Sequence, residues 1–117
     1  MSTGPIPTDI QLHTRSRELE LGYPGGENYR LSCEYLRVYS PSAEVKGHGP
    51  GQEVLQTGKL KVAITAIRPV GNYALQLVFD DGHDTGLYSW DYLYQLCAER
   101  QERWQDYLDR VSAAGAE

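Results

Sequence analysis

The chain has 117 residues, which is the size of one domain, and its formal net charge is -5, from 11 Lys and Arg against 16 Asp and Glu. Hydrophobic residues make up 40% and charged residues 23%, which excludes a collagen-like, wholly disordered or membrane-spanning chain. The acidic balance also excludes a general nucleic-acid binder, because such a protein must neutralise phosphates.

The first third of the chain predicts a three-stranded meander. Apolar and polar residues alternate, as in half-buried strands, in residues 9–14, 18–21 and 28–31. The cluster from Pro24 to Gly26 separates the last two runs and is typical of a hairpin turn. We expect residues 1–8 to form a flexible leader before this meander.

The N-terminus and the cysteines indicate the compartment. Residues 1–7 contain no basic start followed by an apolar run, so we expect no signal peptide and a cytoplasmic protein. Cys33 and Cys97 form no CxxC pair, which excludes a disulfide scaffold and an all-cysteine zinc site. Reduced thiols are the expectation, without a bridge between the two.

The middle of the chain predicts one short helix and a long loop. Ser32 is a suitable N-cap for helical turns over residues 33–38, which end before the Ser40-Pro41-Ser42 sequence. Residues 41–58 then show little periodicity, and Gly47 to Gln52 contains three glycines and a proline. Loops of this length inside a small domain are usually functional or disordered.

The last part predicts a strand pair, a short strand and one long helix. Residues 62–69 and 73–80 form the clearest hairpin, and Asp81-Gly82 makes a tight turn into a strand over residues 84–88. Ser89 is expected to cap a single helix running to about Ser112, because apolar residues recur there every three or four positions. The predicted fold is α+β: an antiparallel meander or small barrel-like sheet, short helical turns and one long C-terminal helix. The domain spans residues 9–112, with a tail at 113–117.

Common catalytic motifs are absent from the sequence. Gly51 to Lys59 does not have Walker A spacing, and there is no G-x-S-x-G elbow and no HExxH motif. We therefore identify no catalytic residue and do not expect an enzyme.

Two segments carry a family resemblance: residues 36–45 (LRVYSPSAEV) with the glycine-rich run at 47–49, and residues 79–83 (FDDGH) with Trp90 and Leu93. Together they are similar to the gamma-butyrobetaine hydroxylase-like N-terminal domain family, over about residues 9–98. Members of this family occur as small standalone bacterial proteins and as the N-terminal domain of carnitine-pathway dioxygenases. A related domain is fused to Mrp-type iron–sulfur carrier ATPases.

The resemblance also implies a possible metal site. In the dioxygenases the domain resembles a zinc-binding unit with three cysteines and one histidine, whose positions here fall on Ser40, Ser42, Val45 and His83. Three of the four ligands are therefore replaced, and neither serine nor valine substitutes for a zinc thiolate. The remaining metal hypothesis is a zinc or iron site on His83 with His48 and Glu44. We expect His83 to be an exposed hairpin-tip residue, hydrogen-bonded to Asp81 or Asp84.

The favoured function is a non-enzymatic accessory or protein-interaction module. Arg37 is expected either to form a salt bridge that holds the Ser40-Pro41 turn or to recognise an anion. Residues 37–68 carry a net charge of +3 (five basic, two acidic) and residues 80–91 a net charge of -4, so the domain is polarised if these segments lie on different faces. The candidate interaction residues are Leu36, Arg37, Ser40, Pro41, Ser42, Glu44, Lys46, His48, Gly49 and Trp90.

The partner is expected to be a protein, with no nucleic acid and no membrane involved. The fusions of related domains imply an iron–sulfur carrier ATPase as the partner class. The sequence predicts no oligomeric state.

Overall fold

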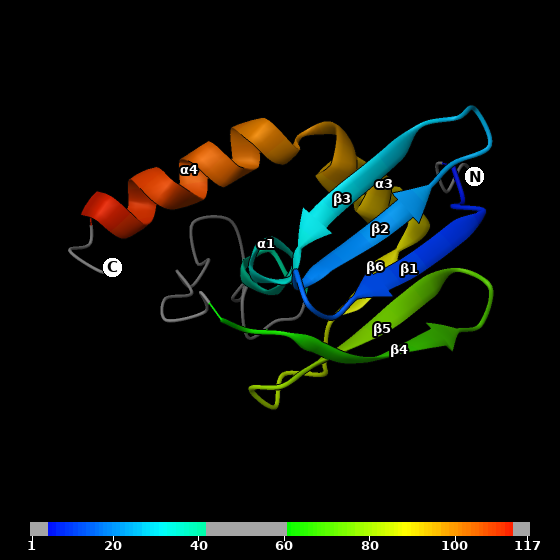
Figure 1. Cartoon of the computed structure of the whole chain (residues 1–117), viewed down its shortest axis with the longest axis horizontal. Helices are drawn as coiled ribbons and strands as arrows, with labels where there is room; N and C mark the ends of the chain where they lie inside the picture. The colour runs from blue at the N-terminus through cyan, green and yellow to red at the C-terminus, as the bar shows by residue number, and fades with distance from the viewer. Residues whose placement is uncertain (1–4, 42–60, 114–117) are drawn as a thin grey trace.

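The computed structural model describes residues 5–41 and 61–113. Its first sheet is the predicted meander, formed by β1 (Asp9–His13), β2 (Glu18–Gly22) and β3 (Asn28–Ser32) in the order β1-β2-β3 (Figure 1). Leu19 pairs with Leu31 and Leu21 with Tyr29 across β2 and β3, so apolar residues share one face of this sheet. Gly26 has a φ of 90° in the β2–β3 turn, a conformation that glycine adopts without a Cβ clash.

The second sheet is also antiparallel, with β4 (Ile64–Val70), β5 (Ala74–Phe79) and β6 (Leu87–Ser89) in that order. A register shift between Ile64 and Ala66 interrupts the β4–β5 ladder. The α+β class is confirmed. The strands of the described residues form two separate three-stranded sheets rather than a closed barrel, so the barrel-like alternative is not what the chain adopts.

Both serine caps are confirmed. Ser32 Oγ accepts from the Tyr35 N–H at 3.1 Å and starts α1 (Cys33–Val38), and Ser89 Oγ accepts from the Tyr92 N–H at 3.1 Å and starts α3 (Trp90–Ala98). A cap of this kind contributes about 1 kcal/mol because it satisfies an N–H at the helix end. No helix within residues 5–41 and 61–113 is long and apolar enough to cross a membrane.

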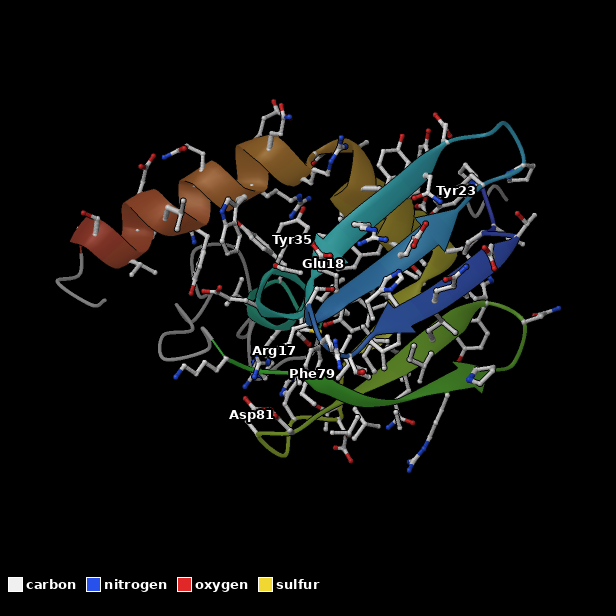
Figure 2. All side chains as sticks on the ribbon, viewed as in Figure 1. Arg17, Glu18, Tyr23, Tyr35, Phe79 and Asp81 are labelled. Atoms are coloured by element: carbon white, nitrogen blue, oxygen red, sulfur yellow. The ribbon has the colours of Figure 1, made fainter. Side chains whose placement is uncertain are left out.

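The predicted single long helix is wrong, because the chain forms α3 and then α4 (Arg100–Ala113) with a break at Glu99. At the break the Leu96 carbonyl accepts from the Tyr35 hydroxyl at 2.8 Å, and the Cys97 carbonyl accepts from Arg100 Nη1 at 2.7 Å. In an unbroken helix these carbonyls would accept from N–H groups four residues ahead. Tyr35 lies on α1, near the end of β3 (Figure 2).

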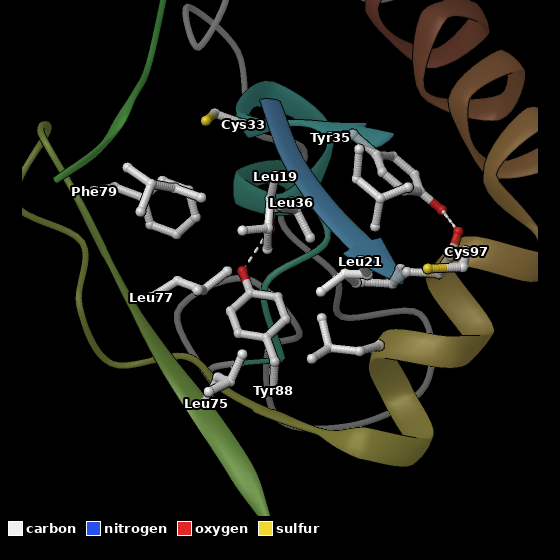
Figure 3. Packing of buried hydrophobic residues seen from close by; sticks show 14 of the residues in the cluster. Leu19, Leu21, Cys33, Tyr35, Leu36, Leu75, Leu77, Phe79, Tyr88 and Cys97 are labelled. Atoms are coloured by element: carbon white, nitrogen blue, oxygen red, sulfur yellow. Dashed lines mark hydrogen bonds between the residues drawn. The ribbon is translucent and has the colours of Figure 1, made fainter. Parts of the chain in front are cut away.

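The core lies between the two sheets and the helices α1 and α3 (Figure 3). Leu19, Leu21 and Leu31 enter it from the first sheet, and Leu77, Phe79 and Tyr88 from the second, all almost completely buried. Cys33 and Cys97 are also buried there as free thiols. Because this core holds α1 and β5 in place, it fixes the positions of the segments that follow each of them.

Candidate functional site

The two segments that carry the family resemblance meet in a polar junction, formed by Arg37, Ser40, Asp81 and His83. Arg37 Nε donates to Asp81 Oδ2 at 2.9 Å, across 44 residues of sequence. Ser40 Oγ lies 2.8 Å from His83 Nε2, across 43 residues. The salt bridge predicted for Arg37 at the Ser40-Pro41 turn is therefore confirmed, and its acceptor is Asp81.

Three of the four residues of the polar junction are buried, and Asp81 lies at its solvent side. Arg37 is 7% exposed, Ser40 is 1% exposed and His83 is 5% exposed. The buried Arg37 guanidinium loses hydration that its attraction to Asp81 only partly restores, so the usual contribution of such a pair is to fix one geometry. The junction therefore holds the end of α1 in a defined position against the β5–β6 connection.

The prediction of an exposed His83 is wrong. The turn after β5 is closed by bonds from Phe79 N–H to His83 O at 3.0 Å and from Gly82 N–H to Phe79 O at 3.2 Å. His83 thus returns alongside the strand end, and its ring packs 6.0 Å from the Phe79 ring, between centroids. Its backbone N–H donates to Asp81 Oδ1 at 3.1 Å, so the expected bond to Asp81 is confirmed. Figure 2 shows Phe79 and Asp81 at this turn.

Tyr88 of β6 and Gly86, which immediately precedes that strand, lie next to the junction. The Tyr88 hydroxyl donates to the Leu36 carbonyl, and burial raises the pKa of Tyr88, so this hydroxyl keeps its proton (Figure 3). Gly86 lies against Ser40, at a point where an added Cβ would overlap the serine hydroxyl. Sequence reasoning missed both roles, because no local signal links residues 86–88 to α1.

The same turn also contacts the residues that precede β4. The Asp80 N–H donates to the Ala63 carbonyl at 2.9 Å, and the Ala63 N–H donates to Asp80 Oδ1 at 3.2 Å. Residues 80–83 therefore bind Ser40 on one side and Ala63 on the other.

The basic and acidic segments do not lie on separate faces at this point. Arg37 comes from the basic segment and Asp81 from the acidic one, and the two are in contact. Part of the opposite charge is therefore neutralised inside the domain rather than presented to a partner.

The structure places the other candidate interaction residues in different ways. Leu36 is completely buried in the core, and Trp90 is largely buried, with its indole N–H donating to the Asn72 carbonyl at 2.8 Å. Pro41 is half-buried at the end of the described segment. Ser42, Glu44, Lys46, His48 and Gly49 lie outside the described residues.

The donors present in the polar junction do not fit the zinc site that the resemblance implies. Positions 40 and 83 are adjacent, as that site requires, but a serine hydroxyl faces His83 Nε2 where a thiolate would bind zinc. Within residues 5–41 and 61–113, no three His, Cys, Asp or Glu side chains are placed to hold a metal ion.

Comparison with known proteins identifies the family to which the chain belongs. The family described as gamma-butyrobetaine hydroxylase-like, N-terminal, matches residues 10–94. Two solution NMR structures are 51% and 55% identical to this chain, each with a TM-score of 0.84; they cover 97% and 100% of this chain, and 89% and 87% of the other chains.

A crystal structure of a protein of unknown function from Acidithiobacillus ferrooxidans, described as belonging to the DUF971 family, is 37% identical, with a TM-score of 0.69. It matches over 85% of this chain and 100% of its own. No curated protein matches the chain. With more than half of its residues matched, the chain belongs to the gamma-butyrobetaine hydroxylase-like N-terminal domain family.

Proposed function

We propose that this chain is a non-enzymatic protein-interaction module whose recognition surface is built around the polar junction. The observation that carries the proposal is that one turn, residues 80–83, binds both Ser40 and Ala63. A rigid scaffold that holds the two ends of a connection is the common way to position a binding segment. The recognition residues expected in that connection are Lys46, His48 and Gly49.

The chemistry of the junction supports positioning rather than catalysis. Arg37 and His83 are buried and hydrogen-bonded to Asp81 and Ser40, so their polar atoms are directed at the fold. A catalytic base needs access to a substrate proton at hydrogen-bond distance. The family relative from Acidithiobacillus ferrooxidans is itself described as a protein of unknown function.

The partner class that we propose is an iron–sulfur carrier ATPase of the Mrp type. The support is the resemblance to domains fused to such ATPases, because fusion partners often interact when they are separate chains. A charged residue at the rim of such an interface mainly changes the association rate. Lys46 is the charge that we place in this contact.

Biolayer interferometry with an immobilised Mrp-type ATPase tests the proposal. We expect the wild-type chain to bind and Lys46→Glu to bind at least about tenfold more weakly, because it reverses a charge in the interface. Arg68→Glu is the matched control, since Arg68 is an exposed residue of β4 and should bind like wild type. Equal binding by both variants, or no binding by the wild type, would contradict the proposal.

The alternative function is a zinc or iron site on His83 with His48 and Glu44. The observation in its favour is that His83 Nε2 lies 2.8 Å from the Ser40 oxygen, at two of the ligand positions that the family resemblance implies. Elemental mass spectrometry of protein purified without an affinity tag tests it. A metal site predicts about one equivalent that is lost in His83→Ala and kept in His13→Ala, whose histidine contacts Glu20 on the first sheet.

A further inference from the structure

A groove of about 360 Å³ lies between β3 and the beginning of α4, away from the polar junction. It opens next to the helix break at Glu99, where α4 diverges from α3 (Figure 1). The residues that matter for its chemistry are Glu18, Arg30, Leu31, Tyr35, Arg100 and Trp104. Tyr35 and Arg37 are two positions apart on α1, so they point to opposite sides of that helix.

The Arg100 guanidinium is the main electrostatic feature of this groove. Arg100 forms no ion pair with any carboxylate of the described residues, and its guanidinium lies over the Tyr29 ring at 4.9 Å and donates to the Cys97 carbonyl. The Arg30 side chain is 51% exposed and lies 3.4 Å from a Glu18 oxygen and 3.5 Å from a Glu20 oxygen. Arg30 therefore already has two carboxylate neighbours, and Arg100 is the guanidinium of the groove that has none in the described part of the chain.

The floor of the groove is apolar and partly aromatic. Leu31 and Tyr35 are buried beneath it, and the half-buried Trp104 packs edge-on against Tyr35, with ring centroids 6.2 Å apart. Arginine, tryptophan and tyrosine side chains surround this small apolar floor. These three residue types are the ones most often found to contribute binding free energy in protein interfaces.

The groove follows the edge of a sheet. In the described part of the chain β3 is the last strand of its sheet, and residues 30–32 line the groove. An edge strand leaves backbone N–H and C=O groups on one side without a strand partner, and a partner's extended segment can pair with them.

We propose that this groove binds a short extended segment of a protein partner in which carboxylate side chains flank an apolar side chain. A carboxylate of the segment would meet the guanidinium group of Arg100, since the planar fork matches a carboxylate. The apolar side chain would lie on Trp104, and the segment's backbone would run beside β3. This inference rests on the proposed function in one respect, namely that the chain is a protein-interaction module.

The shape of the groove favours a segment over a small molecule. Small ligands are usually buried on most sides, whereas this groove is open to solvent along a strand edge. The Arg100 charge, which has no carboxylate neighbour in the described part of the chain, selects an acidic segment over a basic one.

Titration of the ¹⁵N-labelled protein with an acetylated peptide, Glu-Asp-Phe-Asp-Glu, tests the inference by NMR. We expect saturable shifts of the Leu31 and Arg100 amides and of the Trp104 indole N–H. Arg100→Glu should weaken binding at least about tenfold. Arg110→Glu is the matched control, because Arg110 is exposed on the same helix and pairs with Asp106. A peptide with lysine for each acidic residue should not bind, and alanine in place of phenylalanine should weaken binding.

The inference is overturned if the lysine peptide binds equally, if Arg100→Glu binds like wild type, or if the shifts lie outside the groove. Phenylacetate binding as tightly as the peptide would assign the groove to a small carboxylate instead. Shifts of the same amides on dilution of the protein alone would assign it to a second copy of the chain. Intact ATPase binding that depends on Lys46, without peptide binding, would leave the proposed function and remove this inference. Peptide binding without ATPase binding would support the groove inference and contradict the proposed ATPase partner.

Discussion

The guanidinium Nε of Arg37 lies 2.9 Å from Asp81 Oδ2, and this ion pair joins α1 to the turn between β5 and β6. The Asp81 side chain is 23% exposed, whereas Arg37 is almost completely covered. The arginine is therefore the partner that depends on the pair, because its charge has been removed from water. Together with the Ser40–His83 contact, this pair connects the two segments that carry the family resemblance.

Asp81→Asn should destabilise the domain by about 2–4 kcal/mol, since it replaces a charged acceptor of the buried Arg37 guanidinium by a neutral one. Urea unfolding followed by circular dichroism measures the free energy of unfolding. Asp106→Asn is the control, because its partner Arg110 is more than half exposed, and it should cost at most about 0.5 kcal/mol. Equal losses in both variants would show that the Arg37–Asp81 pair contributes no more than a surface pair.

Gly86→Ala should cost about 1–3 kcal/mol, because the added Cβ overlaps the Ser40 hydroxyl that contacts His83. The same substitution in a Ser40→Ala background should cost at least about 1 kcal/mol less, since the overlapping oxygen is then absent. A double-mutant cycle of unfolding free energies measures this coupling. Gly25→Ala is the control, because a Cβ there meets nothing within 4 Å. Additive effects of Gly86→Ala and Ser40→Ala would contradict the predicted contact.

Alkaline pH should destabilise the protein through Cys97. Burial raises the pKa of the Cys97 thiol to about 11, above its ordinary value of 9.0. The folded state therefore holds this proton more tightly than the unfolded state. The resulting stability is complete below pH 9 and is lost as the pH rises toward 11.

This loss should amount to about 2 kcal/mol between pH 8 and pH 11. Urea unfolding of wild type and Cys97→Ala across this range isolates the contribution, because the buried tyrosines titrate in both proteins. The stability of wild type relative to Cys97→Ala should fall by that amount. Parallel pH curves for the two proteins would refute the assignment to Cys97.

Tyr35→Phe should destabilise the domain by about 1–2 kcal/mol, since it removes the donor that the Leu96 carbonyl uses at the helix break. The backbone amides around Glu99 should also exchange their hydrogens faster in Tyr35→Phe than in wild type. Tyr73→Phe serves as the control, because the Tyr73 side chain is exposed and the change should be nearly neutral. If the two variants unfold alike, the Tyr35 hydroxyl does not stabilise the break.

Local patterns in the sequence predicted most elements of this fold. The alternation around Leu19 and Leu31 places them on one sheet face, and Ser32 and Ser89 cap the helices that follow them. These features depend on residues within a few positions of one another. The helix break at Glu99 was not predictable in this way, because one of its two side-chain donors, Tyr35, is 61 residues from the acceptor.

The candidate site shows the same division between local and long-range causes. The sequence by itself determined the α+β class, the strands, the two caps and the two segments that carry the family resemblance, since periodicity and capping are short-range properties. Only the tertiary structure decided that Arg37 meets Asp81, that His83 turns inward to Ser40, and that β3 and α4 form a groove. The reason is physical: each of these contacts joins residues that the core brings together from distant parts of the chain.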